Sequence, residues 1–257
     1  MNYSLLQSLI MKTNLLILIK YLITGSLLLS FFSCSPEYLP NMASTPVFED
    51  KGEIQANIGA GISGTDAQLA YAVSDHIGVM ANTSFRSQTS DTTDDFHKHN
   101  FAEFGAGYYT KIAEKATISV YGGYGFGNVK SKVDNNLIDN DVTDADFNRI
   151  FLQPSIGVTT RHFDASFTPR LVLVDVKYKE EVLNEAKGYH PIIEPVLTTR
   201  FGFENVKFIT QAGLSLPFNG EKLDFDIQPF ILSVGVHLNI DLIADDSSDS
   251  DKSSYDY

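Results

Sequence analysis

Residues 53–62 read EIQANIGAGI, in which polar or small residues alternate strictly with aliphatic ones. Ile54 and Ile58 fall on one side of this alternation, and Gln55 and Asn57 fall on the other. Successive side chains of a strand point to opposite faces of its sheet, so a period of two residues indicates an extended strand. The stretch therefore predicts a β-strand that is apolar on one face only.

The same alternation recurs from Gly52 to about Ile240, without a convincing period of 3.6 residues. We predict ten strands, at 52–62, 67–74, 77–87, 97–110, 117–130, 147–161, 165–177, 190–202, 206–216 and 227–240. Most of them reach the roughly 9–11 residues that a tilted strand needs to cross a bilayer. The predicted fold is all-β, an up-and-down antiparallel transmembrane barrel of about ten strands, with eight as the alternative count.

The links between the predicted strands differ in length. Those after the second, fourth, sixth and eighth strands are short, whereas those after the third, fifth, seventh and ninth are longer and polar, such as 88–96, 131–146 and 178–186. Only the link after the first strand (63–66) departs from this rule. Short turns at one end and long loops at the other are typical of outer-membrane barrels. An even strand count predicts that both termini lie on the short-turn, periplasmic side.

The composition excludes two other classes of protein. The formal charge of -13 repels phosphate backbones, so we predict no nucleic-acid partner. Only one apolar run approaches the roughly 20 residues that a membrane helix needs, which excludes a bundle of membrane helices. That run, Leu15–Phe32, follows Lys12 and contains Lys20. A lysine near a helix centre costs about 2.5–3.5 kcal/mol, so a cleaved secretion signal is favoured over a permanent anchor.

Ser33 and Cys34 follow this apolar run, and Cys34 is the only cysteine, so an internal disulfide is excluded. The stretch resembles a bacterial lipoprotein signal, although Phe31 and Phe32 depart from the usual residues before the cysteine. The resemblance implies that Cys34 is acylated and begins the mature chain; an unmodified buried cysteine is the alternative. The expected organisation is a signal at 1–33, an extended tether at 34–51, a barrel at 52–240 and an acidic disordered tail at 241–257.

Several polar residues share the face opposite the aliphatic one, at similar heights along their strands. They are Gln68, Glu103, Gln153, Arg170 and Glu194. In a small barrel this face points into the lumen, which side chains largely fill. We predict a belt of hydrogen bonds and ion pairs that plugs the lumen, with a conducting or binding path as the alternative. Arg161, Arg200 and Lys207 are expected to add positive charge near the short-turn end.

The chain carries no pattern that predicts catalysis. The Asp-rich stretch 139–148 lacks the glycine and the glutamate of a calcium loop, and His97 and His99 have no third ligand at a fixed spacing. No nucleophile elbow, HExxH motif, phosphate loop or dinucleotide fingerprint is supported by a strand–helix unit. We therefore predict no enzyme, no catalytic residue, no metal and no cofactor.

The segments EFGAGYY (103–109) and YGGYGFG (121–127) combine glycines with aromatic residues. In this combination of glycines and aromatic residues, residues 52–240 resemble small outer-membrane barrels of the OmpA and OmpX type. The resemblance implies the outer membrane of a Gram-negative bacterium, with outer-membrane lipid and the barrel assembly machinery as partners. The expected role is structural or surface interaction, with an unknown extracellular ligand at the loops. The alternative is a soluble, lipocalin-like periplasmic lipoprotein that binds a hydrophobic ligand.

Overall fold

The computed structural model describes residues 36–89, 95–133, 141–179, 188–218, 223 and 225–241. The predicted signal, Cys34 and the tail after Asp241 lie outside these residues. Within the described ranges, no helix is long and apolar enough to cross a membrane.

The regular elements of the described chain are strands. They are β1 (Glu53–Gly61), β2 (Gly64–Ala72), β3 (Ile77–Thr89), β4 (Phe96–Ala113), β5 (Ala116–Val133), β6 (Asp141–Thr159), β7 (Phe163–Tyr178), β8 (His190–Gly202), β9 (Val206–Leu214), β10 (Leu216–Pro217) and β11 (Phe230–Asp241). The two-residue β10 follows β9 after Ser215 and pairs with the start of β8.

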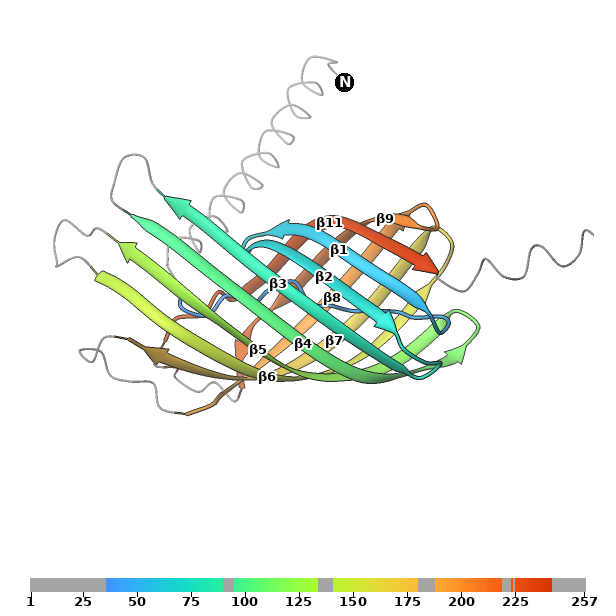
Figure 1. Cartoon of the computed structure of the whole chain (residues 1–257), viewed down its shortest axis with the longest axis horizontal. Coiled ribbons are helices and arrows are strands. Elements are labelled where there is room, and N and C mark those ends of the chain that lie inside the picture. The colour runs from blue at the N-terminus through green and yellow to red at the C-terminus, as the bar shows by residue number, and fades with distance from the viewer. Residues whose placement is uncertain are drawn as a thin grey trace, which may run out of the picture. The chain divides into compact units, whose positions relative to one another are not determined.

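The strands close into a barrel (Figure 1). Each of β1 to β8 pairs antiparallel with the next, β9 bridges β8 and β11, and β11 pairs with β1. The closing pair runs from Glu53 opposite Asp241 to Gly61 opposite Ser233. The predicted all-β, up-and-down antiparallel barrel of ten strands is thus confirmed.

Some predicted boundaries were wrong. β5 extends to Val133 and β6 begins at Asp141, so the Asp-rich stretch 131–146 is largely strand, and 134–140 lie outside the described residues. Val129, Ala145 and Phe147 are buried. The alternation of inward and outward side chains therefore continues along both strands to the loop end, the end of the barrel that carries the long loops. The hairpin between β1 and β2 is also tighter than predicted. Gly64 adopts a positive φ of 134°, where a Cβ would lie 2.5 Å from the carbonyl oxygen of Phe85.

The strand prolines do not create the bulges that they suggest. Pro154 lies opposite Val120 and Pro195 lies opposite Pro169, in each case without a change of register. The pairing of β6 with β7 is interrupted between Leu152 and Ile156, but the same register resumes beyond the gap. Because proline lacks the N–H of a ladder hydrogen bond, the sheet loses bonds here but keeps its alignment.

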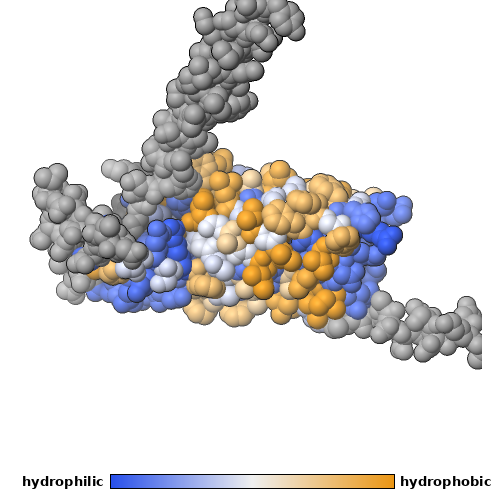
Figure 2. All heavy atoms as spheres, turned by 90° about the horizontal axis from the view of Figure 1, so that it is seen from above, coloured by the Kyte–Doolittle hydropathy of each residue, from blue (hydrophilic) through white to orange (hydrophobic). Residues whose placement is uncertain are grey.

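The two faces of the barrel wall differ sharply in polarity. Large aliphatic side chains point outward, with Ile58 65% and Leu152 48% exposed, whereas the inward side chains of Gln55 and Gln153 are buried. Figure 2 shows the outward residues as an apolar band between two hydrophilic ends. The alternation in the sequence therefore separates an apolar outer surface from a polar lumen.

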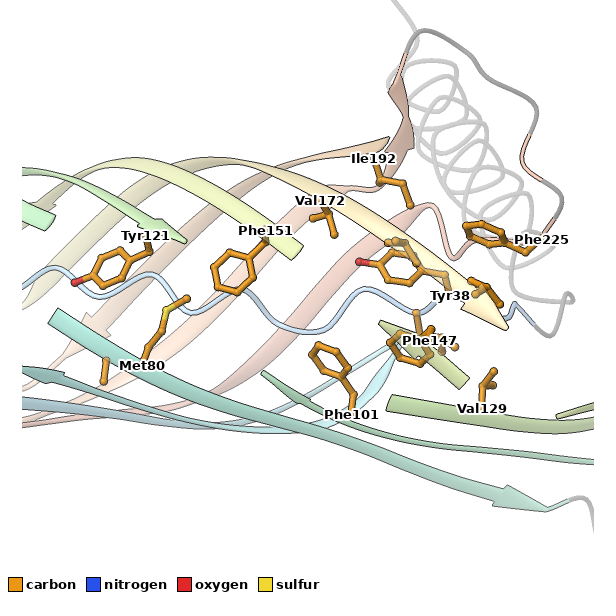
Figure 3. Close-up of a cluster of buried hydrophobic side chains, with 14 of the residues drawn as sticks. Tyr38, Met80, Phe101, Tyr121, Val129, Phe147, Phe151, Val172, Ile192 and Phe225 are labelled. Carbon is orange, nitrogen blue, oxygen red and sulfur yellow. The ribbon is translucent and has the colours of Figure 1, made fainter. Parts of the chain in front are cut away.

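The structure corrects the prediction for the residues before β1. Residues 36–50 do not form a tether outside the barrel but run through its lumen, and every residue from Tyr38 to Phe48 is buried (Figure 3). We call Pro36–Asp50 the inner segment. It begins beside Asp226, at the end of the barrel with the long loops, and reaches β1 at the short-turn end. The first strand begins and the last strand ends at the short-turn side, as predicted, but the described chain itself begins at the opposite, loop end of the barrel.

Candidate functional site: the filled lumen

The inner segment is held at the loop end by the residues that precede β11. The backbone N–H groups of Glu37 and Tyr38 both donate to the carbonyl oxygen of Asp226, each at 3.1 Å. The N–H of Gln228 donates to the carbonyl oxygen of Tyr38 at 3.0 Å, and Tyr38 forms a parallel bridge with Ile227. These contacts fix the position at which the chain passes into the barrel.

Further toward the short-turn end, glutamine side chains of the barrel wall bind the backbone of the inner segment. Gln211 accepts from the N–H of Ala43 at 2.9 Å and donates to its carbonyl oxygen at 2.6 Å. Gln55 makes the same pair of bonds with Val47, at 3.2 and 3.0 Å. A primary amide carries both a donor and an acceptor, so it can pair with a backbone as a neighbouring strand does.

The two glutamines predicted for the belt have the same role. Gln68 donates to the carbonyl oxygen of Met42 at 2.6 Å, and Gln153 donates to that of Ser44 at 2.6 Å. Both side chains point inward and are buried. They bind the inner segment, whereas the predicted belt consisted of contacts between wall side chains across the lumen.

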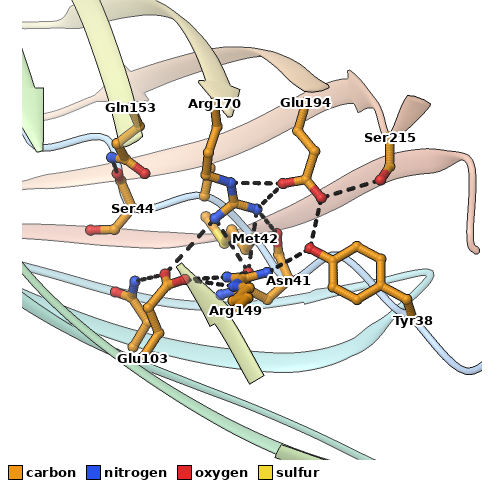
Figure 4. A network of polar contacts seen from close by, with 12 residues as sticks. Tyr38, Asn41, Met42, Ser44, Glu103, Arg149, Gln153, Arg170, Glu194 and Ser215 are labelled. Atoms are coloured by element: carbon orange, nitrogen blue, oxygen red, sulfur yellow. Dashed lines mark hydrogen bonds and ion pairs between the residues drawn. The ribbon is translucent and has the colours of Figure 1, made fainter. Parts of the chain in front are cut away.

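Charged side chains form a network next to these glutamines (Figure 4). Arg149 donates to Glu103 from Nε at 2.8 Å and also from Nη2. Arg149 Nη1 donates to the hydroxyl oxygen of Tyr38 at 2.9 Å, and its guanidinium lies 4.2 Å from the ring centre of Phe101. The inner segment is therefore bonded directly to the ion pair through Tyr38.

A second ion pair completes the network. Arg170 Nε donates to Glu194 Oε2 at 2.7 Å, and Arg170 Nη1 lies 3.8 Å from Glu103 Oε1. The hydroxyl of Tyr38 donates to Glu194 Oε1 at 2.9 Å. Asn41 accepts from both arginines through its side-chain oxygen. Two guanidinium groups thus balance two carboxylates, and the four side chains are fully buried.

An apolar cluster runs along the lumen, from Phe48 and Tyr109 near the short turns to Phe225 at the loop end (Figure 3). The rings of Phe101 and Phe147 stack at 5.5 Å, and Tyr38 meets Phe147 edge-on at 6.1 Å. Gly125 and Gly127 leave room for these rings, since a Cβ there would lie 2.5 Å from Phe101 and 2.8 Å from Phe147. Gly123, Gly125 and Gly127 are therefore small lumen positions that alternate with the outward residues Tyr124 and Phe126, whereas Gly122 lies on the outward face.

Glycines also make room for the inner segment near the short-turn end. A Cβ at Gly157 would lie 2.8 Å from Val47 Cγ2, and one at Gly78 would lie 2.8 Å from Phe48 Cε2. At Gly59 the distance to Met42 Sδ would be 3.1 Å. The wall and the inner segment are thus in close contact at these three positions.

The three cations predicted near the short-turn end have different surroundings. Lys207 donates to Asp164 Oδ1 at 2.6 Å, and Arg200 donates to the carbonyl oxygen of Thr45 at 2.6 Å; both are buried. The side chain of Arg161 is 73% exposed and lies 3.3 Å from Glu204. Arg161 therefore contributes nothing to the lumen.

The structure brings together Glu103, Arg170 and Glu194 from the predicted belt. The sequence reasoning missed Arg149, Tyr38 and Asn41 as members of the network. Arg149 shares its parity with Gln153 on β6, a signal that could have included it. Tyr38 and Asn41 were missed because their stretch was interpreted as a tether, although Tyr38, Leu39, Met42, Val47 and Phe48 make it richer in apolar residues than a solvated linker needs.

The candidate metal ligands have other partners or lie apart. In the described part of the chain, no group of three His, Cys, Asp or Glu side chains could hold a metal ion. Asp144 forms ion pairs with Lys130 at 2.7 Å and Lys179 at 3.2 Å, whereas Asp139 lies outside the described residues. The carboxylates of Asp146 and Asp144 raise the pKa of the Lys179 ammonium. His97 and His99 lie with their ring centres 5.9 Å apart on β4.

Neither the known protein families nor the curated protein sequences contain a match to this chain.

Proposed function

We propose that the chain is an outer-membrane β-barrel lipoprotein with a structural or surface-interaction role, a plugged lumen and loops that face outward. The observation that carries the proposal is the polarity of the wall. Its outward side chains are mostly large and apolar, and its inward side chains are buried, with polar and charged groups beside an apolar cluster. A protein in water needs the opposite arrangement, because exposed apolar surface is costly there.

Aromatic residues support a membrane boundary at each end of the apolar band. Phe163, Phe201 and Phe208 lie side by side on neighbouring strands near the short turns, and the rings of Phe201 and Phe208 are 5.1 Å apart. Tyr124 and Phe126 point outward toward the loop end. Aromatic girdles flank the apolar band of outer-membrane barrels at both interfaces. Beyond Tyr124 and Phe126, toward the loop end, the outward side chains of β5 become polar: Asn128 is followed by Lys130.

The filled lumen argues against transport through the barrel and against the lipocalin-like alternative. A lipocalin-like protein would need an open apolar interior for its ligand. Here the middle of the lumen holds the ion pairs of Arg149 and Arg170, and the inner segment runs past them. We therefore assign the surface-interaction role to the loops, which join long strands that continue past the apolar band.

The proposal predicts different effects for outward substitutions within the apolar band and outward substitutions beyond it. Leu152→Lys places a charge in the apolar band and should destabilise the inserted barrel by about 2–4 kcal/mol. The matched control is Asn148→Lys on the same strand and the same face, where the outward positions are already polar.

The experiment measures heat-modifiable migration on a denaturing gel, after extraction of outer membranes. We expect the wild type and Asn148→Lys to migrate faster when unheated than when heated, and Leu152→Lys to lose the fast form. A protein that passes fully into the aqueous phase once its lipid is removed, with no heat-dependent shift, would contradict the proposal.

A further inference from the structure

We infer that the inner segment crosses the full thickness of the membrane, so that the N-terminal end of the mature chain and the long loops share one side, opposite the C-terminus. The inference rests on the proposed membrane insertion and concerns which end of the chain faces which side. It departs from the simple expectation for an even-stranded barrel, in which both ends emerge together.

The direction of the segment follows from its contacts at the loop end. Tyr38 lies beside Ile227, and Glu37 accepts a hydrogen bond from the N–H of Asp226 at 2.7 Å. Residues 226–229 lead directly into β11 at Phe230, which lies opposite Leu214 at the loop end of β9. Pro36 and Glu37 therefore lie among the residues that connect strands on the loop side.

The other end of the segment lies among the short turns. The N–H groups of Glu49 and Asp50 both donate to Glu53 Oε1, at 2.7 and 2.5 Å, and the carbonyl oxygen of Phe48 accepts from Thr117 at 3.4 Å. Thr117 follows the short turn between β4 and β5. The inner segment thus contacts both rims of the same barrel.

The length of the segment matches this path. Asp50 lies twelve positions after Tyr38. An extended chain rises about 3.3 Å per residue, which gives about 40 Å for these twelve steps. The apolar band of an outer-membrane barrel is about 25 Å tall. The segment is therefore long enough to pass both interfaces.

The segment is also fixed along its length, so it does not slide to the other side. Gln211, Gln55 and Gln153 bind its backbone, and Tyr38 is bonded to both ion pairs through Arg149 and Glu194. Withdrawal would leave these buried groups without hydrogen-bond partners, which is unfavourable for each neutral group and more so for each charged group.

The consequence concerns the predicted lipid anchor. Cys34 precedes Pro36 by two residues, which span at most about 7 Å of extended chain. An acyl group on Cys34 would then insert into the leaflet next to the long loops. If the loops face outward, that leaflet is the outer one, and the N-terminal anchor is displayed at the cell surface.

The test places one epitope at each of three positions in otherwise full-length chains: between Ser35 and Pro36, within 134–140 after β5, and after Tyr257. Each tagged protein is exposed to a protease on intact cells and again after the outer membrane is permeabilised. We expect the tags before Pro36 and within 134–140 to be cut on intact cells, and the C-terminal tag to be cut only after permeabilisation.

The alternative outcomes separate the inference from the proposed function. Protection of the first two tags with exposure of the C-terminal tag would support the shared side and reverse the proposed orientation. Equal behaviour of the first and last tags, opposite to the loop tag, would overturn the inference. Cutting of all three tags only after permeabilisation, without a heat-dependent gel shift, would overturn membrane insertion itself.

A labelling experiment tests the path independently of the tags. Ser44→Cys lies in the buried part of the segment, whereas Ser87→Cys lies on an exposed position of β3. In the folded protein we expect a small maleimide to label Ser87→Cys at least tenfold faster than Ser44→Cys, and the difference to vanish on unfolding. Equal rates in the folded protein would show that the segment does not occupy the lumen.

Discussion

The side-chain amide of Gln211 forms two hydrogen bonds with the backbone of Ala43, one to its N–H at 2.9 Å and one to its carbonyl oxygen at 2.6 Å. The two residues are far apart in the sequence and belong to different parts of the fold, the wall and the inner segment. At Ala43, Gln211 thereby supplies the pair of hydrogen bonds that a neighbouring strand would give.

Gln211→Ala should therefore destabilise the folded barrel. The substitution leaves the N–H and carbonyl oxygen of Ala43 buried without these partners, and we expect a loss of about 1–3 kcal/mol in the free energy of unfolding. The measurement is urea-induced unfolding in detergent, followed by gel migration. Gln88→Ala is the matched control, because Gln88 is exposed on β3, and it should change stability by less than about 0.5 kcal/mol. Equal effects of the two substitutions would contradict the role of Gln211.

The ion pair of Arg149 with Glu103 should show strong coupling. Removal of one partner leaves a buried charge uncompensated, so Glu103→Gln and Arg149→Met should each cost about 3–5 kcal/mol. The double variant should cost clearly less than the sum of the two, because it leaves no unpaired charge. Glu204→Gln, at the exposed pair with Arg161, should cost at most about 1 kcal/mol. Additive effects at positions 103 and 149 would indicate that the two side chains act separately.

Gly157→Val tests the fit between the wall and the inner segment. Its side chain would meet Val47, and the resulting overpacking should destabilise the protein by about 1–3 kcal/mol. Gly122→Val is the control, because a Cβ there meets no atom closer than 3.6 Å. Thermal unfolding monitored by the gel shift should separate the two variants. If Gly122→Val lowered the unfolding temperature more than Gly157→Val, contacts within the wall, and not contacts with the inner segment, would limit the size of the side chain.

Removal of the inner segment should open the lumen. In planar bilayers we expect the full-length protein to give negligible ion conductance and a variant lacking residues 38–48 to give discrete conducting steps. Tyr38→Ala is a milder variant that keeps the segment, and it should lower stability without conductance. Conductance of the wild type equal to that of the deletion variant would show that the segment does not block the barrel.

The sequence predicted the barrel because its pattern is local. Apolar and polar residues, such as Ile54 and Gln55, alternate along each strand. The face on which each residue lies can therefore be inferred from the strand alone, without knowledge of distant partners. The same parity predicted that Gln68, Glu103, Gln153, Arg170 and Glu194 point inward, where all five are buried. The alternation does not show which residues an inward side chain contacts.

The inner segment could not be predicted in this way. A chain inside a lumen is surrounded on all sides, so it has no apolar and polar face and shows no period. Its partners, such as Gln211 for Ala43 and Glu194 for Tyr38, lie more than 150 residues away. Prolines and serines in the stretch indicated only that it is extended, which is correct, and the interpretation as an external tether followed from the missing period.

The pairing of β1 with β11 carries a consequence for the order of assembly. The inner segment is joined to β1 through Lys51 and Gly52, and Gln55 on β1 and Gln68 on β2 already bind its backbone. It can therefore lie along the inner surface of the first hairpin while the sheet is still open. When β11 pairs with β1, the sheet closes around a chain that is already in place. No end of the polypeptide has to be drawn through a finished ring.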